Sequence, residues 1–249
     1  MKKFKVSLIT VCYNAEASIK RCIESIVSQD YPDYEHIVID GGSTDNTLEI
    51  INSFSDKVSI IVSERDKGVY DAMNKGIRLA GGDIVGTLNA DDYFASNDVL
   101  STVAERFAGT TADIVYGDLD YINLNETIQR KWRTRAYKHG FYNWGWMPPH
   151  PTFYCKKELF EKFGYYRLDY GTAADYELML RFMHRHRVRA VHLNKVMIKM
   201  QCGGLSNKNP TNRVKAWKYD LKAMRHNSIL YPLIAVILKP LRKIGQYLK

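Results

Sequence analysis

The chain has 249 residues, of which 45% are hydrophobic and 25% are charged. These proportions are those of an ordinary globular protein, and they exclude an intrinsically disordered chain and a protein with several membrane-spanning segments. The formal net charge is +9, and Lys and Arg crowd into segments 130–135, 181–189 and 208–249, which indicates an anionic partner or surface.

The first apolar run, residues 6–11, is short and contains Ser7 and Thr10, so we expect a first strand rather than an export signal. No apolar stretch approaches the length required to span a bilayer. The four cysteines are far apart and include no C-x-x-C pair, which argues against a zinc site or a disulfide framework. We therefore expect reduced thiols in a cytoplasmic protein.

Short apolar runs alternate with amphipathic helices over residues 6–117, the pattern of repeated βαβ units and a mostly parallel sheet. The first helix carries apolar residues at helical spacing from Ile19 to Val27, the second begins after segment 43–45, and the third covers residues 69–79. Strands are predicted at residues 6–11, 36–39, 58–62, 84–88 and 114–116.

The pattern changes after Asp118, where residues 121–132 predict a strand or hairpin and residues 141–151 an aromatic, Pro-rich loop. The remaining predictions are helices near residues 156–163, from residue 175 and near 210–224, and strands at 190–193 and 196–200. We expect this half to pack onto the first as the acceptor-facing part of one domain.

Polar or acidic clusters follow the predicted strands at segments 13–14, 40–45 and 89–92 and at Asp118. Because the carboxyl ends of parallel strands share one edge of a sheet, these clusters should converge on one cleft. A basic chain that gathers carboxylates in one place is expected to hold a divalent cation and an anionic ligand there. This pattern predicts a nucleotide-using enzyme.

Each cluster also has a structural interpretation. Segment 43–45 is expected to be a turn and helix cap, whereas Asp40 is expected to contact a ligand, because a turn alone does not require that carboxylate. Asp91 is the predicted metal ligand, and Asp92 is left as a supporting acid or a helix cap. The segment after the first strand lacks G-x-G-x-x-G, which disfavours NAD-type chemistry.

Five ordered segments resemble the family-2 glycosyltransferases of the GT-A fold, most closely the bacterial members that build exopolysaccharide or lipopolysaccharide. They extend from residue 11 to residue 178, about two thirds of the chain, and are 11–14, 40–45, 68–77, 88–92 and 173–178. The resemblance implies an α/β, Rossmann-like GT-A fold with a mostly parallel central sheet flanked by helices.

The resemblance also implies a nucleotide-diphosphate sugar as donor, a divalent metal (Mn²⁺ or Mg²⁺) and inversion at the anomeric carbon by a single displacement. By their place in the motifs, Asp40 matches the acid that contacts the nucleoside, Asp91 the metal-facing acid of the D-x-D motif, and Asp175 the catalytic base. The sequence departs from the pattern at Asn89, where a first acid often stands, and at Gly41, which replaces a second acid.

The residues expected to line the donor site are Val11, Tyr13, Asn14, Asp40, Gly42, Ser43, Asp66, Gly68, Asn74, Asn89, Ala90 and Asp91. His150 is a candidate for contact with acceptor or diphosphate, with a structural role equally open. Gly203 and Gly204 suggest a flap over the diphosphate, with a plain turn as the alternative. The Q-x-x-R-W motif of processive synthases is missing, so we expect one sugar per encounter.

Residues 228–249 form a basic amphipathic tail whose expected place is the membrane surface, with a helix packed on the domain as the alternative. We therefore predict a glycosyltransferase domain over residues 1–227, divided into a nucleotide-sugar-binding half (1–118) and an acceptor-side half (119–227). The predicted enzyme is cytoplasmic, peripheral on the inner face of the cell membrane, and acts on a lipid-linked glycan; no nucleic acid is expected. Two rival hypotheses are a nucleotidyltransferase and a basic RNA- or membrane-binding module without activity.

Overall fold

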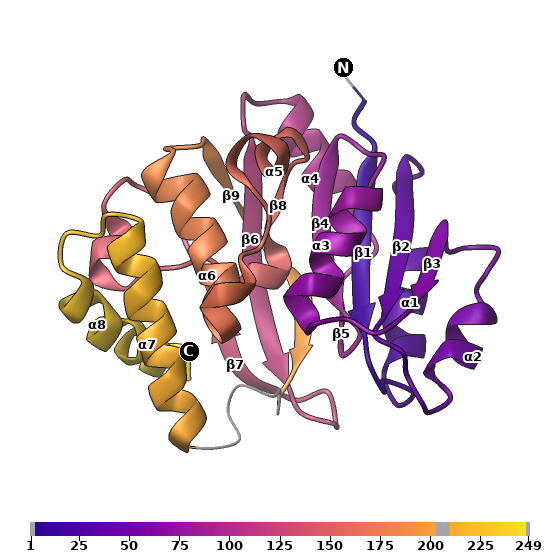
Figure 1. Cartoon of the computed structure of the whole chain (residues 1–249). Coiled ribbons are helices and arrows are strands. Elements are labelled where there is room, and N and C mark those ends of the chain that lie inside the picture. The colour runs from indigo at the N-terminus through magenta and orange to yellow at the C-terminus, as the bar shows by residue number, and fades with distance from the viewer. Residues whose placement is uncertain (1–2, 203–209, 248–249) are drawn as a thin grey trace.

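The structure is a computed structural model that describes residues 3–202 and 210–247 (Figure 1). Its sheet has nine strands in the order β3-β2-β1-β4-β8-β6-β9-β5, and β7 extends the sheet from β6. The strands are β1 (Val6–Cys12), β2 (Tyr34–Asp40), β3 (Ile60–Ser63), β4 (Ile84–Asn89), β5 (Asp92–Phe94), β6 (Ile114–Ile122), β7 (Ile128–Trp132), β8 (Tyr154–Lys156) and β9 (Ala190–Gln201).

Helices cover both faces of the sheet, which is the arrangement expected of βαβ units (Figure 1). The α-helices are α1 (Ile19–Val27), α2 (Thr47–Asn52), α3 (Val69–Leu79), α4 (Val99–Ala108), α5 (Glu158–Phe163), α6 (Ala174–Met179), α7 (Pro210–His226) and α8 (Pro232–Ile244). Short 3₁₀ segments are η1 (Phe141–Trp144), η2 (His150–Thr152) and η3 (Leu168–Ala173), and a π-helical segment, η4 (Leu180–Arg185), continues α6.

The sheet is mixed. Strands β3, β2, β1 and β4 are parallel neighbours, β8 lies antiparallel between β4 and β6, and β9 runs parallel to β6. Consequently β6 and β9 point the same way as the first four strands, while β5, β7 and β8 point the opposite way. The α/β class predicted from the sequence is confirmed, and six strands present their carboxyl ends at one edge.

The central strand β1 is buried at all seven positions because it lies between β2 and β4 under helices on both faces. The apolar stripe predicted for the first helix packs inward: Ile19, Cys22, Ile23 and Ile26 of α1 are fully buried. These residues join the cores that hold the strand ends in register.

Several elements differ from the sequence predictions, among them three strands. Strands β5 and β8 have three residues each, too short to show an alternating pattern, and neither was predicted. The predicted strands 190–193 and 196–200 are one strand, β9, whose register with β6 shifts between Tyr116 and Asp118. That irregularity places polar residues inside the strand, so the sequence pattern suggested two pieces.

The C-terminal helix α8 is docked on the domain against α7 and η1. Gly145, which follows η1 with a φ of 73°, makes this possible because a Cβ built there would lie 2.5 Å from the backbone nitrogen of Lys239 and 2.8 Å from the carbonyl oxygen of Ala235. Both the backbone conformation and the close approach favour glycine at this position.

Candidate active site

The carboxyl ends of four neighbouring strands lie level with one another. Cys12, the last residue of β1, is paired with Asp40 of β2, and Asp40 is paired with Ser63 of β3. On the other side of β1, Val11 is paired with Asn89 at the end of β4. The structure thus brings these strand ends to one edge of the sheet, the lower edge in Figure 1.

Asp118 on β6 lies at the same height along the sheet as Asn89 on β4, as their pairing with the intervening strand β8 shows. Cys155 of β8 is paired with Val85 of β4 and with Ile114 of β6. Asn89 and Asp118 each lie four residues further along, so the two side chains stand at corresponding heights on parallel strands. The carboxylate of Asp118 is buried.

The Asp40 carboxylate at the end of β2 is fully buried and is hydrogen-bonded within the loop that follows this strand. It accepts hydrogen bonds from the backbone N–H groups of Gly42 (3.2 Å) and Ser43 (3.0 Å), from the Ser43 hydroxyl, and from the Ser63 hydroxyl (2.6 Å). Burial alone would raise the pKa of this carboxyl, but the hydrogen bonds from Ser43 and Ser63 outweigh it and hold the pKa below its ordinary value. The direct nucleoside contact expected for Asp40 stays a prediction, since its oxygens already have partners inside the loop.

The loops after β1 and β2 are joined by polar contacts. The Asn14 amide N–H donates to the Ser43 hydroxyl (2.8 Å), and the Thr44 N–H donates to the Asn14 side-chain oxygen (2.9 Å). Asn14 has a φ of 48°, a left-handed conformation that asparagine tolerates better than most residues. Tyr13 beside it is 63% exposed, so its ring is free to contact a ligand.

Asp66 stands against the glycine that replaces the second acid of the first motif. A Cβ built on Gly41 would lie 2.7 Å from Asp66 Oδ2. The other oxygen, Asp66 Oδ1, accepts the N–H of Gly68 at 2.7 Å, just before α3 begins. The carboxylate of Asp66, from the loop after β3, therefore lies next to Gly41, the position at which the family motif often has a second acid.

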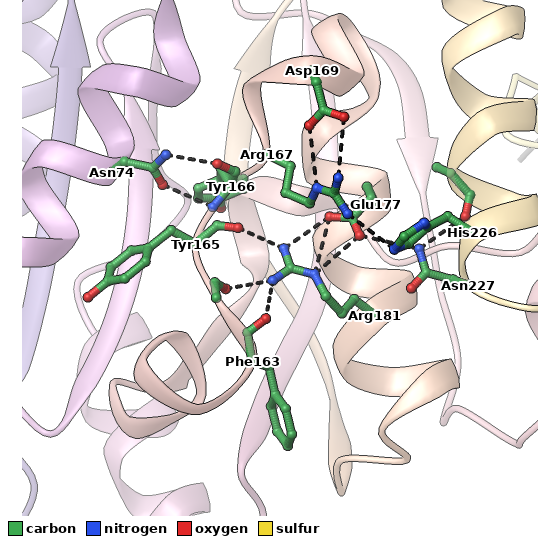
Figure 2. A network of polar contacts seen from close by, with 12 residues as sticks. Asn74, Phe163, Tyr165, Tyr166, Arg167, Asp169, Glu177, Arg181, His226 and Asn227 are labelled. Atoms are coloured by element: carbon green, nitrogen blue, oxygen red, sulfur yellow. Dashed lines mark hydrogen bonds and ion pairs between the residues drawn. The ribbon is translucent and has the colours of Figure 1, made fainter.

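Asn74 is tied to a different part of the chain than expected. Its amide nitrogen donates to the Tyr166 carbonyl and its amide oxygen accepts the Tyr166 N–H, both at 2.9 Å (Figure 2). The side chain is buried and each of its polar atoms already has one partner in the protein, and the expectation that Asn74 lines the donor cleft stays a prediction. Asn74 fastens α3 to the segment before α6.

The segment after β4 contains two oxygens without hydrogen-bond partners. Asp92 is buried, and its Oδ2 accepts the amide nitrogen of Asn89 at 3.2 Å. Among residues 3–202 and 210–247, Asp92 Oδ1 and Asn89 Oδ1 are also buried and lack a hydrogen-bond partner, and the backbone of Gln201 is near enough to the Asp92 carboxyl to oppose the rise of its pKa. Burial, followed by the charge of Asp91, raises the pKa of Asp92 well above its ordinary value.

Asp91 is partly exposed and adjoins this pair. Oxygen atoms that lack hydrogen-bond donors beside a second carboxylate suit a hard divalent cation. Over residues 3–202 and 210–247, no group of three or more His, Cys, Asp or Glu side chains is arranged to hold a metal ion. A cation here would accordingly need oxygens from a ligand such as a diphosphate to complete its coordination.

The end of β9 lies against the same segment. Asp92 is paired with Met200 on the antiparallel ladder between β5 and β9, and the next residue, Gln201, accepts a hydrogen bond from Arg21 at 3.0 Å. The predicted flap residues Gly203 and Gly204 lie outside the described residues. The last residues described before that segment lie beside Asp92, because Met200 is its partner on the ladder.

Asp175 lies in the first turn of α6 with two polar neighbours. The Tyr70 hydroxyl donates to Asp175 Oδ1 (3.3 Å), and His150 Nδ1 lies 3.4 Å from Asp175 Oδ2. Burial and the nearby Asp175 carboxylate raise the pKa of Tyr70, which keeps its hydroxyl protonated as a donor. The structure therefore unites His150 with Asp175, a pairing that no sequence spacing indicated.

Tyr70 links the two halves of the site. It lies two residues after Gly68, whose N–H donates to Asp66, and its hydroxyl contacts Asp175. The sequence analysis did not select Tyr70, and its only sequence signal is its place inside the matched segment 68–77.

A buried ion pair joins α6 to the π-helical segment η4 that continues it (Figure 2). Arg181 and Glu177 lie 3.0 Å apart and are 6% and 0% exposed. Arg181 also donates to three consecutive carbonyl groups, those of Phe163, Gly164 (2.8 Å) and Tyr165 (2.7 Å). The network fixes the helix that carries Asp175 to the loop that Asn74 holds.

Comparisons with known proteins agree with this geometry. The sequence model described as Glycosyl transferase family 2 matches residues 7–169. A PGL/p-HBAD biosynthesis glycosyltransferase of Mycobacterium bovis (strain BCG / Pasteur 1173P2) is 32% identical over 213 residues, which cover 81% of this chain and 78% of the relative. Glycosyltransferase AglE of Haloferax volcanii is 34% identical over 125 residues, 48% of this chain and 41% of the relative.

Solved structures show the same fold. The mannosyltransferase PcManGT from Pyrobaculum calidifontis, in complex with GDP-Man and Mn²⁺, has a TM-score of 0.69 at 19% identity and covers 96% of this chain and 73% of its own. S. aureus TarS 1-349, in complex with UDP-GlcNAc, has a TM-score of 0.67 at 17% identity and covers 94% and 69%. At these identities the likeness establishes the fold, which is the GT-A fold.

Proposed function

The chain belongs to glycosyl transferase family 2, and from this we propose that it transfers one sugar from a nucleotide-diphosphate sugar to a glycan acceptor, with inversion. The observation that carries the proposal is the level alignment of the strand ends that hold Asp40, Ser63 and Asn89, with Asp91 directly after them. This edge is where α/β proteins bind nucleotides. That two proteins of the same fold bind UDP-GlcNAc and GDP-Man supports the choice of donor.

Asp91, Asn89 and Asp92 are the residues proposed to hold Mn²⁺ or Mg²⁺ together with the donor. The partnerless oxygens of Asn89 and Asp92 favour this assignment, because a cation would satisfy both. When bound, the ion supplies positive charge that stabilises the departing diphosphate. The donor site is proposed to include, besides these residues, Val11, Tyr13, Asn14, Asp40, Gly42, Ser43, Asp66, Gly68 and Ala90.

Asp175 is proposed as the base that takes the proton from the attacking acceptor hydroxyl. Hydrogen bonding from Tyr70 fixes one carboxylate oxygen, and His150 stands beside the other. With both neighbours in place, the carboxylate has one orientation toward the acceptor. His150 is thereby proposed to position Asp175 rather than to contact the diphosphate.

The proposed acceptor is a lipid-linked oligosaccharide at the inner face of the cell membrane. Exposed apolar side chains along α8 support this proposal: Leu233 (61%), Ile237 (57%), Leu241 (51%) and Ile244 (57%). Such a helix suits the boundary between water and lipid. Over the described residues, no helix combines the length and apolar character needed to cross a bilayer.

We further propose that residues 1–227 form the catalytic unit, in which residues 1–118 bind the donor and residues 119–227 face the acceptor. Residues 228–249 then serve as the membrane-facing tail. The docking of α8 against α7 and η1 supports a tail that has a fixed position on the catalytic unit.

Thermal unfolding in the presence of nucleoside diphosphates and their sugars, with and without Mn²⁺, tests the proposal. A ligand that binds only the folded state at 100 times its Kd adds about 2.7 kcal/mol, so the matching donor should raise Tm clearly and only with the ion. Asp91→Asn should abolish the Mn²⁺-dependent part. Salt-sensitive RNA binding without a response to any nucleotide sugar would favour the non-enzymatic alternative.

A further inference from the structure

A cavity of about 280 Å³ lies between β7 and α8, at the end of the sheet opposite to α2 (Figure 1). Its lining contains no Asp or Glu. Six cationic side chains line it, namely Lys131, Arg133, Arg135, Lys239, Arg242 and Lys243.

Only two of these cations are neutralised. Arg133 forms an ion pair with Asp120 at 2.6 Å, and Lys239 forms one with Asp220 at 2.7 Å. The other four, Lys131, Arg135, Arg242 and Lys243, have no carboxylate within 4.0 Å among the residues that the structure describes. The cavity therefore concentrates positive charge without a matching anion.

The surroundings disfavour this charge. Loss of hydration lowers the pKa of Lys243, and the nearby Lys239 and Arg130 lower it further, while Asp220 and Asp175 oppose the shift. Burial and then Arg135 lower the pKa of Arg242. Arg135, Arg242 and Lys243 are nevertheless exposed, so water screens part of the repulsion among them, and an anion bound between them would relieve the rest.

The cations are not accounted for by helix capping alone. Arg242 and Lys243 stand in the last turn of α8, where cations favour the helix dipole, and Arg242 Nε donates to the Trp144 carbonyl at 2.7 Å. That interpretation does not cover Lys131 and Arg135, because they come from β7 and the segment after it. Arg135 also lies over the Phe141 ring, 4.3 Å from its centre, which leaves its charge without a carboxylate partner. Cationic residues from two separate parts of the chain thus line one cavity.

The cavity adjoins the proposed base. The Lys239 ammonium lies 3.7 Å from the centre of the Tyr176 ring, and Tyr176 directly follows Asp175. Asp175 itself is near enough to favour the charged form of Lys243. On its outer side, α8 presents exposed Leu241 and Ile244 between the cationic positions.

We propose that this cavity binds the phosphate or diphosphate that joins the acceptor glycan to its lipid. The inference rests on the proposed function and narrows the acceptor to a glycan carried on a lipid phosphate ester. The anion lies among Lys131, Arg135, Arg242 and Lys243, the glycan extends toward Asp175, and the lipid chain lies along the exposed apolar side of α8. Among phosphate esters we assign the acceptor rather than a phospholipid headgroup, because Lys239 of the cavity lining contacts Tyr176, the residue next to the proposed base Asp175.

The test uses the full chain and farnesyl diphosphate, with inorganic pyrophosphate as a second probe, by titration calorimetry at constant salt. The variant Lys131→Gln, Arg135→Gln, Lys243→Gln should weaken binding of both probes at least tenfold, since three charge-assisted contacts are lost. A control with the same loss of charge elsewhere, Lys57→Gln, Arg106→Gln, Lys162→Gln, should bind as the wild type does. If the triple variant does not fold, Lys243→Gln alone should weaken binding severalfold, and Lys243→Arg should restore it.

Equal weakening by the cavity variant and the control would reduce the effect to net charge and overturn the proposal. Unchanged binding of farnesyl diphosphate together with weaker binding to phosphatidylglycerol vesicles would assign the cavity to headgroups instead. Stabilisation of the wild type by nucleotide sugars is measured in parallel. If that stabilisation is missing, the proposed function fails; if it is present but the cavity variant binds normally, only this inference fails.

Discussion

Asp92 combines burial, a raised pKa and an oxygen without a hydrogen-bond partner. We predict that Asp92→Asn stabilises the metal-free protein by about 1–3 kcal/mol, the usual cost of an unsatisfied buried polar group. The folded-state pKa lies above the unfolded value, so the wild type loses stability as pH rises from about 4 through the folded pKa. The gain should therefore be larger at pH 8 than at pH 5 in urea unfolding.

Two comparisons make that prediction specific. Added Mn²⁺ and donor should stabilise the wild type and not Asp92→Asn. Asp98→Asn is the matched control, because an ion pair with Lys195 lowers the pKa of Asp98, so the same substitution there should not stabilise. A loss of stability in Asp92→Asn at pH 8 would contradict the account of the site.

Asp175→Asn should lower turnover at least a hundredfold, because an amide cannot accept the proton of the acceptor hydroxyl. Stabilisation by the nucleotide sugar should be retained, since Asp175 is not expected to touch the donor. Asp169→Asn is a suitable control: this half-exposed acid of the neighbouring segment pairs with Arg167 and Lys222, and exposed pairs contribute little. Near-normal turnover in Asp175→Asn would show that another group is the base.

Individual roles were only partly predictable. Asp91 and Asp175 were selected because they stand at motif positions, and their roles stay predictions; the structure leaves Asp91 partly exposed and gives Asp175 two polar neighbours. The enclosure of Asp40 and the double hydrogen bond of Asn74 were not foreseen, because each depends on a partner distant in the chain, Ser63 and Tyr166 respectively. A motif shows which residue type is present, but not which of its atoms are already bound.

The α6 helix depends on the buried Arg181–Glu177 pair shown in Figure 2. We predict that Arg181→Met lowers the free energy of unfolding by about 3–5 kcal/mol, because Glu177 and three carbonyl groups lose their donor. Arg185→Met, one turn later and exposed, should change it by less than about 0.5 kcal/mol. If both variants lost the same free energy of unfolding in urea, the Arg181–Glu177 network would not stabilise the fold more than an exposed arginine does.

The secondary structure also divides into elements that the local sequence predicts and elements that depend on distant partners. The helices α1 and α3 and the strands β1 and β4 were predictable, since burial on one or both faces imposes a regular apolar pattern on them. The short strands β5 and β8 are set by their neighbours, because three residues pair only where β9, β4 and β6 provide partners. Local sequence carries little information about such strands.

The exposed apolar side of α8 is proposed to rest on lipid. We predict that Ile237→Gln, Leu241→Gln together weaken binding to phosphatidylglycerol vesicles by at least about a hundredfold, since each buried aliphatic side chain contributes about 1.5–3 kcal/mol and two of them are lost. Leu124→Gln is the control, because Leu124 is 82% exposed but lies in the turn between β6 and β7. Equal sedimentation of both variants with vesicles would remove α8 from the membrane contact.

The arrangement of the whole molecule is consistent with separate places for the two proposed substrates. The proposed donor residues come from the strand ends of the first half, and the cationic cavity is lined by β7 and α8. Tyr70 and His150 both contact Asp175, whose neighbour Tyr176 contacts Lys239 of the cavity lining. The order of the strands was beyond the sequence, because the antiparallel insertion of β8 between β4 and β6 depends on contacts across the whole sheet.

Gly145 has a wider consequence than its size suggests. Because Gly145 has no Cβ, the backbone of α8 packs directly against the backbone after η1. The packing of α8 on the domain therefore depends on a glycine at this position. We expect any side chain there to displace α8, and with it the cationic residues Lys239, Arg242 and Lys243, while the strand ends keep their positions. If the proposed function holds, such a variant would still bind the donor but would bind the acceptor poorly, so Gly145 would couple the position of α8 to acceptor recognition alone.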